Sequence, residues 1–193
     1  NFEVTPRLKN SKNASTTNKE IEKKYEKVKE ALAKENYKMA EELLRQAIAL
    51  DPRESISYYK LGNLLQINLA RYDEAENAYR QAIALDPKDA SSHNNLGDLL
   101  QDHLARYDEA ESAYRQAIAL SPKEASSHHN LGDLLKDHLA RYDEAESAYR
   151  QAIALDPKFA GSHHNLGYLL HYRLARYDEA ESAYRQAIAL DPK

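Results

Sequence analysis

Small and apolar residues recur at helical spacing along most of this chain, and the whole pattern repeats with a fixed period. The stretch from Arg141 to Pro157 recurs unchanged from Arg176 to Pro192. Copies with one substitution each run from Arg106 to Pro122 and from Arg71 to Pro87, and a divergent copy runs from Asn36 to Pro52. Successive copies begin at residues 36, 71, 106, 141 and 176, a spacing of 35 residues. A fixed period of this length predicts stacked supersecondary units rather than one closed globule.

Each period is predicted to hold two antiparallel helices of about 14 to 17 residues. The repeated stretch alternates small and large residues on one helical stripe, in the first full copy Tyr72, Ala75, Tyr79, Ala82 and Ile83. The stretch before it (residues 57–65 and its counterparts) forms the other helix and carries a glycine near its middle. Glycine there costs about 1 kcal/mol relative to alanine. We therefore expect the second helix to approach closely at each of them, namely Gly62, Gly97, Gly132 and Gly167.

Proline-containing dipeptides mark the predicted helix starts. Asp51, Asp86, Ser121 and Asp156 each precede a proline. We interpret them as N-cap residues, with the proline at the first helical position. Ser121 is followed three residues later by Glu124, which predicts a capping box.

The two ends of the chain depart from the repeat. Residues 1–16 are polar without a helical period and are predicted to be a flexible tail. In an alternative interpretation, Phe2, Val4, Pro6 and Leu8 form an extended segment that docks in a groove. Thr17 and Glu20 are spaced as a capping box that opens a divergent, solubilising first helix. The predicted domains are thus a tail (1–16) and one array (17–193), with units of about 17–51, 52–86, 87–121, 122–156 and 157–193.

The last predicted helix has no polar closing helix after it. Solenoids generally need such a cap. We therefore expect the array to be truncated, with Tyr177, Ala180, Tyr184 and Ile188 exposed and able to stack end to end on another molecule.

Charge and composition narrow the function classes. The net charge of −4 gives no electrostatic case for nucleic acid or an anionic membrane as a partner. No apolar run approaches the roughly 20 residues that span a bilayer. The chain has 0 Cys, which excludes disulfides and thiol chemistry. No secretory signal is visible, so a cytoplasmic location is expected.

Leu61, Gly62, Tyr72, Tyr79 and Pro87, together with the alanines between them, resemble the tetratricopeptide repeat, whose unit is about 34 residues long. The resemblance implies an all-α fold, an α-solenoid of about five antiparallel helix pairs that forms a right-handed superhelix. Two departures stand out. The unit here is one residue longer, near Leu69–Arg71, and the family's early bulky aromatic is Tyr58 once and then His93, His128 and His163.

The resemblance also implies a concave groove, lined by one arc of the first helices, that binds an extended peptide. Variation concentrates on this arc while the second helices are nearly identical, which favours the arc as the functional surface. The asparagines before Leu-Gly resemble the backbone-gripping ladder of the O-linked N-acetylglucosamine transferase repeats. In an alternative reading they merely face solvent in a duplicated unit, and Lys60 would end the ladder. The candidate groove residues are Tyr59, Asn63, Asn94, Asn95, Asp98, Asp102, His129, Asn130, Asp133, Asp137, His164, Asn165, Tyr168 and Tyr172.

No catalytic constellation and no cofactor site is predicted from the sequence. His129 and Asp133 stand one helical turn apart, but we predict no metal site there, because the histidines read more simply as packing residues. The aspartates of the arc would repel a terminal carboxylate, so a neutral or basic peptide is the expected ligand.

The sequence therefore predicts a non-catalytic scaffold for protein–protein interaction. One alternative is a regulatory or substrate-recognition array from a larger enzyme, and another is a near-consensus array without an evolved ligand.

Overall fold

The computed structural model describes residues 7–192, with side chains from residue 16 onward. The chain divides into two compact units, Asn1–Pro87 and Lys88–Lys193, which we call unit 1 and unit 2. Unit 1 contains α1 (Arg7–Ala33), α2 (Tyr37–Leu50), α3 (Ser55–Asn63), the π-helical segment η1 (Leu64–Asn68) and α4 (Tyr72–Leu85). Unit 2 contains α5 (Ala90–Asp102), α6 (Tyr107–Leu120), α7 (Ala125–Asp137), α8 (Tyr142–Leu155), α9 (Ala160–Tyr172) and α10 (Tyr177–Leu190).

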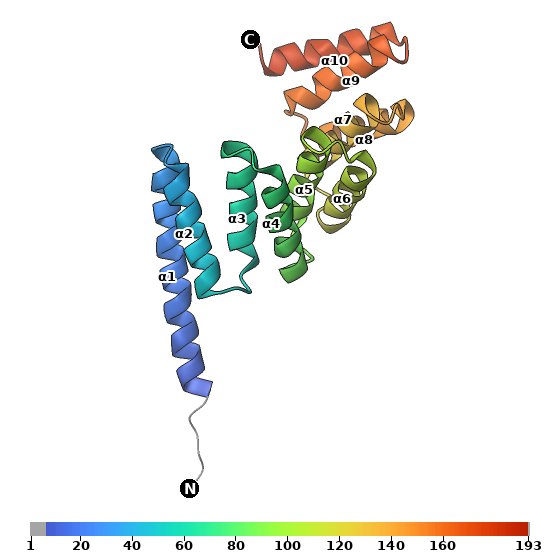
Figure 1. Cartoon of the computed structure of the whole chain (residues 1–193). Coiled ribbons are helices and arrows are strands. Elements are labelled where there is room, and N and C mark those ends of the chain that lie inside the picture. Colours follow the sequence, from blue (N-terminus) through green and yellow to red (C-terminus); the bar gives the residue numbers. More distant parts are fainter. Residues whose placement is uncertain (1–6, 193) are drawn as a thin grey trace. The chain divides into compact units, whose positions relative to one another are not determined.

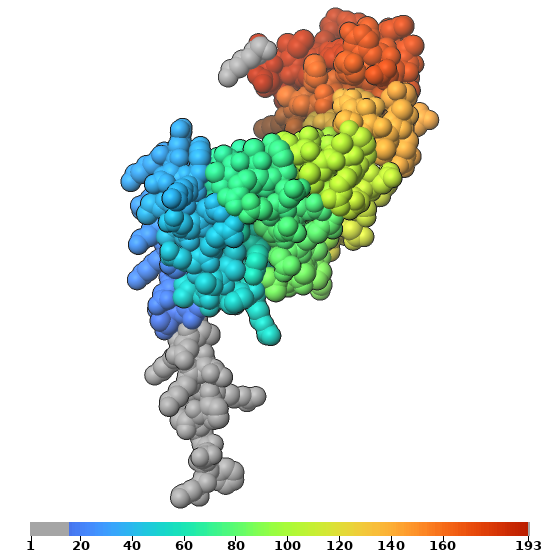
Figure 2. All heavy atoms as spheres, viewed as in Figure 1, coloured from blue at the N-terminus to red at the C-terminus, as the bar shows by residue number. Residues whose placement is uncertain are grey.

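Within each unit the helices pair as the repeat predicts. Neighbouring helices in the chain run side by side in opposite directions, as α1 with α2 and α9 with α10 (Figure 1). The residues that the structure describes contain helices and no strand, which confirms the all-α class. Figure 2 shows how closely the atoms of α2 and α3 pack within unit 1. The right-handed turn of the whole array stays a prediction.

The predicted close approach at the glycines is confirmed. A Cβ atom placed on Gly97 would lie 2.6 Å from Cε1 of Tyr114, and one on Gly132 would lie 2.7 Å from Cε1 of Tyr149. Both tyrosines are almost completely buried, so the ring of the second helix rests directly on the backbone of the first. Glycine is needed here for contact between helices rather than for an unusual backbone conformation.

The predicted N-caps at the prolines are wrong. The first helix of each later pair begins three residues after its proline. The residues directly before the prolines, such as Asp51 and Asp156, are instead C-caps of the preceding helices α2 and α8. The side chain of Asp156 accepts a hydrogen bond from the backbone N–H of Lys158 (3.0 Å) and so closes a tight turn. Asp89 caps α5 through the N–H groups of Ser91 and Ser92, while Glu124 at the start of α7 makes no cap hydrogen bond, so no capping box forms.

The turn inside each later pair is wider than the turn between α1 and α2. The N–H of Asn36 bonds to the carbonyl of Ala31, five residues back, whereas the N–H of Arg106 bonds to the carbonyl of Leu100, six residues back. Ala105, directly before Arg106 in this wider turn, has a positive φ of 51°. The corresponding segment of unit 1 is η1. The residue that lengthens the repeat is therefore accommodated at the end of the first helix, where we predicted it.

Helix α1 begins ten residues earlier than the predicted capping box. It starts at Arg7, so Thr17 lies inside the helix and does not open it. The prediction failed because it searched for an apolar period. From Arg7 on the helix contains neither proline nor glycine, and extending an existing helix through polar residues costs little per residue. Residues 1–6, which include the possible docking segment, lie outside the described residues.

The exposure expected on α10 holds for two of its four residues. Tyr177 is 59% exposed and Ile188 is 64% exposed. Ala180 is completely buried against α9, and Tyr184 is half-buried, so the prediction is wrong for these two. End-to-end stacking through α10 stays a prediction, which light scattering at increasing protein concentration can test.

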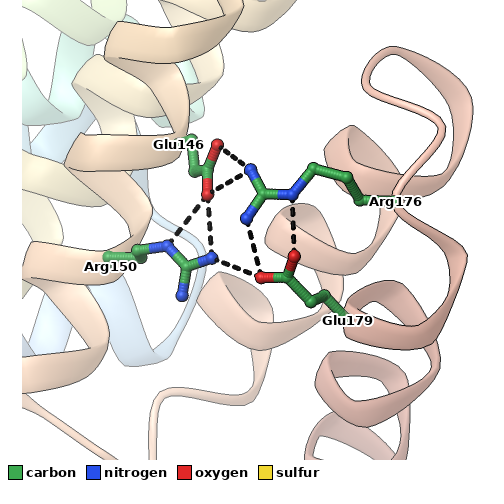
Figure 3. A network of polar contacts seen from close by, with 4 residues as sticks. All are labelled: Glu146, Arg150, Arg176 and Glu179. Carbon is green, nitrogen blue, oxygen red and sulfur yellow. Dashed lines mark hydrogen bonds and ion pairs between the residues drawn. The ribbon is translucent and has the colours of Figure 1, made fainter.

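Glutamate–arginine pairs on the second helices join into larger networks (Figure 3). Glu146 accepts a hydrogen bond from Arg150 on its own helix. It also accepts one, at 2.7 Å, from Nη1 of Arg176 at the start of α10. Glu179 closes the network by binding both arginines. Glu146 and Arg150 lie four residues apart in the sequence, which favours their pairing within one helix. That spacing does not show that such pairs link one second helix to the next.

Candidate functional site

The candidate face consists of the first-helix residues predicted to line the groove. In unit 2, three helices contribute to it: α5, α7 and α9. Its residues fall into two groups by exposure. Asp102, Asp137, His164, Tyr168 and Tyr172 are exposed, while the remaining unit 2 candidates are half-buried. The exposed group can touch a partner directly, and the half-buried group holds neighbouring helices together.

Hydrogen bonds from a side-chain amide and from a tyrosine hydroxyl to one shared carboxylate link successive helix pairs. Nδ2 of Asn130 on α7 donates to Oδ1 of Asp98 on α5 at 2.8 Å. The same carboxylate oxygen accepts a hydrogen bond from the hydroxyl of Tyr114 on α6 at 2.7 Å. One amide hydrogen of Asn130 is thus already committed inside the molecule. Asn130 acts first as a connector between repeats, not as a free rung for a ligand.

The same arrangement of amide, carboxylate and hydroxyl recurs one repeat later, among α7, α8 and α9. Nδ2 of Asn165 donates to Oδ1 of Asp133 at 2.7 Å, and the hydroxyl of Tyr149 donates to the same oxygen. The ladder hypothesis assumed that these amides were available to a peptide backbone. The hypothesis did not include the aspartate 32 residues earlier, which accepts the hydrogen bond from the asparagine amide. Sequence spacing alone does not assign this aspartate as a partner.

Burial changes the acidity of this network. Burial raises the pKa of Asp98 to about 6, against the opposing hydrogen bonds from Tyr114 and Asn130. The nearby carboxylates of Asp102 and Asp133 contribute to this rise in pKa. The pKa of the Tyr114 hydroxyl is also raised, mainly by burial and then by the charge of Asp98. The connection between α5 and α7 therefore includes a carboxyl group whose pKa lies near 6 rather than near 4.

His129 connects α7 with the start of α9. Its Nδ1 lies 3.0 Å from Oγ of Ser162 on α9, and its ring packs against that of Phe159 with centroids 4.6 Å apart. Its Nε2 lies 3.4 Å from Oδ2 of Asp133. Burial lowers the pKa of His129 although Asp133 opposes the shift. Between residues 16 and 192, no group of three or more His, Cys, Asp or Glu side chains could hold a metal ion.

Lys136 is a component of the face that sequence reasoning did not single out. It is only 8% exposed, and its Nζ lies 3.3 Å from Asp137. The same ammonium group lies 5.8 Å from the ring centroid of Tyr149 and 5.3 Å from that of Tyr168. The charge of Lys136 is thus balanced inside the molecule by a carboxylate and by two aromatic rings.

Aromatic rings gather on α9, where the earlier first helices carry aspartates. Tyr168 and Tyr172 lie with ring centroids 4.7 Å apart, and His171 lies 4.4 Å from Tyr172. Tyr172 is 62% exposed. Exposed rings of this kind are common at protein interaction sites. The aromatic end and the acidic part of the face thus differ in chemistry.

The early histidines of the first helices have a packing role. His128 and His163 place Nε2 3.2 Å and 3.0 Å from the carbonyl oxygens of Pro122 and Pro157. In unit 1, the hydroxyl of Tyr58 donates to the equivalent carbonyl of Pro52 at 3.4 Å. The histidines therefore replace the aromatic residue in its contact with the preceding turn.

In unit 1 the candidate residues are Tyr59 and Asn63, both half-buried. Oδ1 of Asn63 accepts a hydrogen bond from the hydroxyl of Tyr79 at 2.7 Å, as the aspartates do in unit 2. Here the acceptor is neutral, so this part of the face lacks the buried negative charge of unit 2.

Sequence comparison establishes the family. Models described as tetratricopeptide repeat or TPR repeat match residues 24–54, 43–77, 70–103, 89–158 and 148–182. The chain belongs to the tetratricopeptide repeat family. A search of curated protein sequences gives no significant match.

Solved structures share the fold at low sequence identity. The chain is similar to PilF of Pseudomonas aeruginosa with a TM-score of 0.82 and 22% identity, over 92% of this chain and 79% of that one. It is similar to MamA of Desulfovibrio magneticus RS-1 with a TM-score of 0.77 and 20% identity, over 90% and 96%. YrrB, described as a TPR protein with an unusual peptide-binding site, gives a TM-score of 0.68 and 21% identity, over 86% and 84%. At these identities the likeness establishes the fold alone.

No helix within residues 7–192 combines the length and the apolar character that a membrane crossing requires.

Proposed function

We propose that this protein is a non-catalytic interaction scaffold whose unit 2 face binds an extended segment of a partner protein. The observation that carries the proposal is the contrast between the two kinds of helix. Helices α8 and α10 are identical in sequence over 14 residues. The first helices α7 and α9 differ on the candidate face, where the half-buried Asp133 and the exposed Asp137 are replaced by the exposed Tyr168 and Tyr172. Divergence concentrated on one side of the first helices favours recognition as its cause, since the leucines and the glycine that pack against the second helices are kept.

The chemistry of the face indicates which segments suit it. Asp102 and Asp137 are exposed, and Tyr168 and Tyr172 provide rings beside them. Carboxylates attract cationic side chains, and rings stack on them or on other apolar groups. We therefore propose a neutral or basic partner segment for unit 2 rather than one that ends in a carboxylate over these aspartates. YrrB provides a precedent for peptide binding by a similar fold, although its ligand carries no information about this chain.

Selection from a random peptide library on the whole chain tests the proposal. Peptides enriched on the wild type should be neutral or basic. Those that depend on the face should bind the double variant Tyr168→Ala/Tyr172→Ala at least about tenfold more weakly, as expected for the loss of anchoring rings. Asp102→Asn/Asp137→Asn should weaken the basic peptides specifically. Gln116→Ala on the exposed side of α6 is the matched control and should leave binding unchanged. Enriched peptides that ignore all the face variants would overturn the proposal.

A further inference from the structure

The sulfur of Met39 is the one sulfur atom of the chain, which contains 1 Met and 0 Cys. Met39 lies in the first turn of α2 and is 47% exposed. The buried residues of α2 are Ala40, Leu43, Leu44 and Ala47, so the thioether lies outside the core. Exposed thioethers are open to oxidation by peroxides, which convert them to sulfoxides. In this chain such an oxidation changes a single, accessible sulfur atom.

Asn36, the N-cap of α2, contacts Met39 in two ways. Oδ1 of Asn36 accepts a hydrogen bond from the backbone N–H of Met39 at 3.1 Å, which caps the helix. Nδ2 of the same side chain lies 3.9 Å from Sδ of Met39. Because a thioether sulfur is a weak acceptor, this second contact contributes little. An amide donor is therefore already in place beside the sulfur, and the strength of the acceptor limits the bond.

The later second helices carry a strong acceptor at the position of Met39. Asn36 and Met39 lie 35 residues before Arg71 and Glu74 of α4. There, Nε of Arg71 donates to Oε1 of Glu74 at 2.7 Å. The equivalent pairs of α6, α8 and α10 make the same hydrogen bond at 2.7, 2.7 and 2.8 Å. Each later copy thus joins its helix start to a side-chain oxygen three residues on, where α2 has sulfur.

The position of Met39 is also more open than its counterparts. Oε2 of Glu74 accepts a second hydrogen bond from Arg45 on α2, the preceding second helix, at 3.3 Å. The corresponding glutamates of α8 and α10 bind an arginine of the preceding second helix in the same way. Among residues 7–192, α2 is the first of the second helices, so it has no such neighbour. A peroxide therefore reaches the sulfur without displacing an ion pair of this kind.

We propose that Met39 is an oxidation site whose sulfoxide is held by Asn36 and strengthens the start of α2. The sulfur lone pair attacks one oxygen of hydrogen peroxide, so that an S–O bond forms and the O–O bond breaks. The departing hydroxide takes the proton left on the sulfur-bound oxygen and leaves as water. The sulfur loses two electrons, and the peroxide is reduced by them. The sulfoxide oxygen then accepts the Nδ2–H of Asn36, as the carboxylate of Glu74 accepts Arg71 in α4.

This effect is the reverse of what methionine oxidation does in a protein core. There the polar oxygen replaces apolar contacts and disrupts packing. Met39 lies outside the core of α2, and its neighbour Asn36 supplies a donor for the new oxygen. Because Met39 belongs to unit 1, this role does not depend on the function proposed for the unit 2 face.

Exchange of backbone amides with solvent, measured by NMR on the full ¹⁵N-labelled chain before and after treatment with hydrogen peroxide, tests the proposal. Mass spectrometry should show one added oxygen atom, on the peptide that contains Met39. The backbone amide of Met39 should then exchange at least about threefold more slowly, because the side chain of Asn36 is held at both its oxygen and its nitrogen. Methionine sulfoxide reductases for both epimers should restore the original rate.

Two variants separate the proposed hydrogen bond from other effects of oxidation. Asn36→Asp keeps an oxygen that caps the helix but lacks the Nδ2 donor, so oxidation should not slow exchange of its Met39 amide. Met39→Gln has no sulfur and should not respond to peroxide. Circular dichroism confirms that both variants stay folded. The proposal is overturned if peroxide oxidises N-acetylmethionine in the same sample but not Met39, if oxidation leaves the exchange rate unchanged or raises it, or if either variant shows the slowing seen in the wild type.

Discussion

At the scale of single residues, the turns between paired helices contain alanine in a conformation that suits glycine. Ala70, Ala105, Ala140 and Ala175 all have φ between 51° and 53°. The left-handed region costs an L-residue with a Cβ about 1–2 kcal/mol. Each of these four turns thus carries a small strain that glycine would remove.

Ala105→Gly should therefore stabilise the protein. We expect a gain of about 1 kcal/mol in the free energy of unfolding, because relief of strain exceeds the extra backbone entropy that glycine loses on folding. Urea denaturation followed by circular dichroism measures the change. The matched control, Ala119→Gly, changes an exposed alanine in the last turn of α6, where no strain is relieved, and should destabilise the protein by up to about 1 kcal/mol. Equal losses for both variants would contradict a strained turn.

The buried Asp98 carboxylate predicts a pH-dependent stability. Its pKa rises from 3.8 to about 6 in the folded state, so the native state binds a proton more tightly than the unfolded chain. The associated stability is fully present below about pH 4 and is lost as the pH rises through 6. From pH 4.5 to pH 7 the loss should be about 2 kcal/mol.

Asp98→Asn isolates this effect from the other titrating groups. The difference in unfolding free energy between wild type and variant should change with pH by the predicted amount, in favour of the variant at pH 7. Urea denaturation of both proteins at the two pH values gives this difference. Asp137→Asn, which changes an exposed carboxylate, should shift little. A difference that stays constant with pH would show that Asp98 ionises normally.

At the scale of helices, the contact between glycine and tyrosine fixes how each pair packs. Because the Cβ of Gly97→Ala would lie 2.6 Å from the buried Tyr114 ring, we expect a net loss of about 1–3 kcal/mol, although alanine favours the helix. Gly161→Ala is the control, since its Cβ would meet Phe159 at 3.3 Å near the start of α9, and the cost should be small. Thermal unfolding of both variants measures the contrast. Tolerance of Gly97→Ala would show that the pair can spread without cost.

The helices also differ in which of their features, their pairing or their starting residues, the sequence could predict. Helical pairs, their period and the role of Gly97 followed from local spacing, because a stripe of apolar residues reports directly on one helix face. The helix starts could not be predicted in this way. The side chain of Asp156 can accept a hydrogen bond from a backbone N–H either at a helix N-terminus or within a turn, and only the direction of the chain after Pro157 decides between the two.

The candidate site was harder to predict for a related reason. The partners of Asn130 and Asn165 lie on the preceding first helix, and no local pattern assigns such contacts. Tyr168 and Tyr172 are exposed, as a role in binding requires, and their place in a binding surface stays a prediction.

At the scale of the whole molecule, a repeat protein draws its stability from contacts between neighbouring units, so equal sequences need not be equally stable. Helices α8 and α10 test this directly, since both read YDEAESAYRQAIAL. Tyr149 on α8 is completely buried, whereas the equivalent Tyr184 on α10 is only half-buried. Helix α8 packs against helices on both sides along the chain, and α10 packs against α9.

Amide hydrogen exchange should therefore differ between two identical sequences. Intrinsic exchange rates in the interiors of α8 and α10 are the same, so any difference in protection reports local opening alone. We expect α10 to open with a free energy lower by about 1–3 kcal/mol, the scale of one large side chain left partly exposed. Exchange measured by NMR on the full chain resolves both helices, and a peptide or second molecule that covers Tyr177 and Ile188 should raise the protection of α10 but not that of α8. Equal protection in the free protein would mean that these helices open in one cooperative step, and that neighbour contacts do not grade stability along this array.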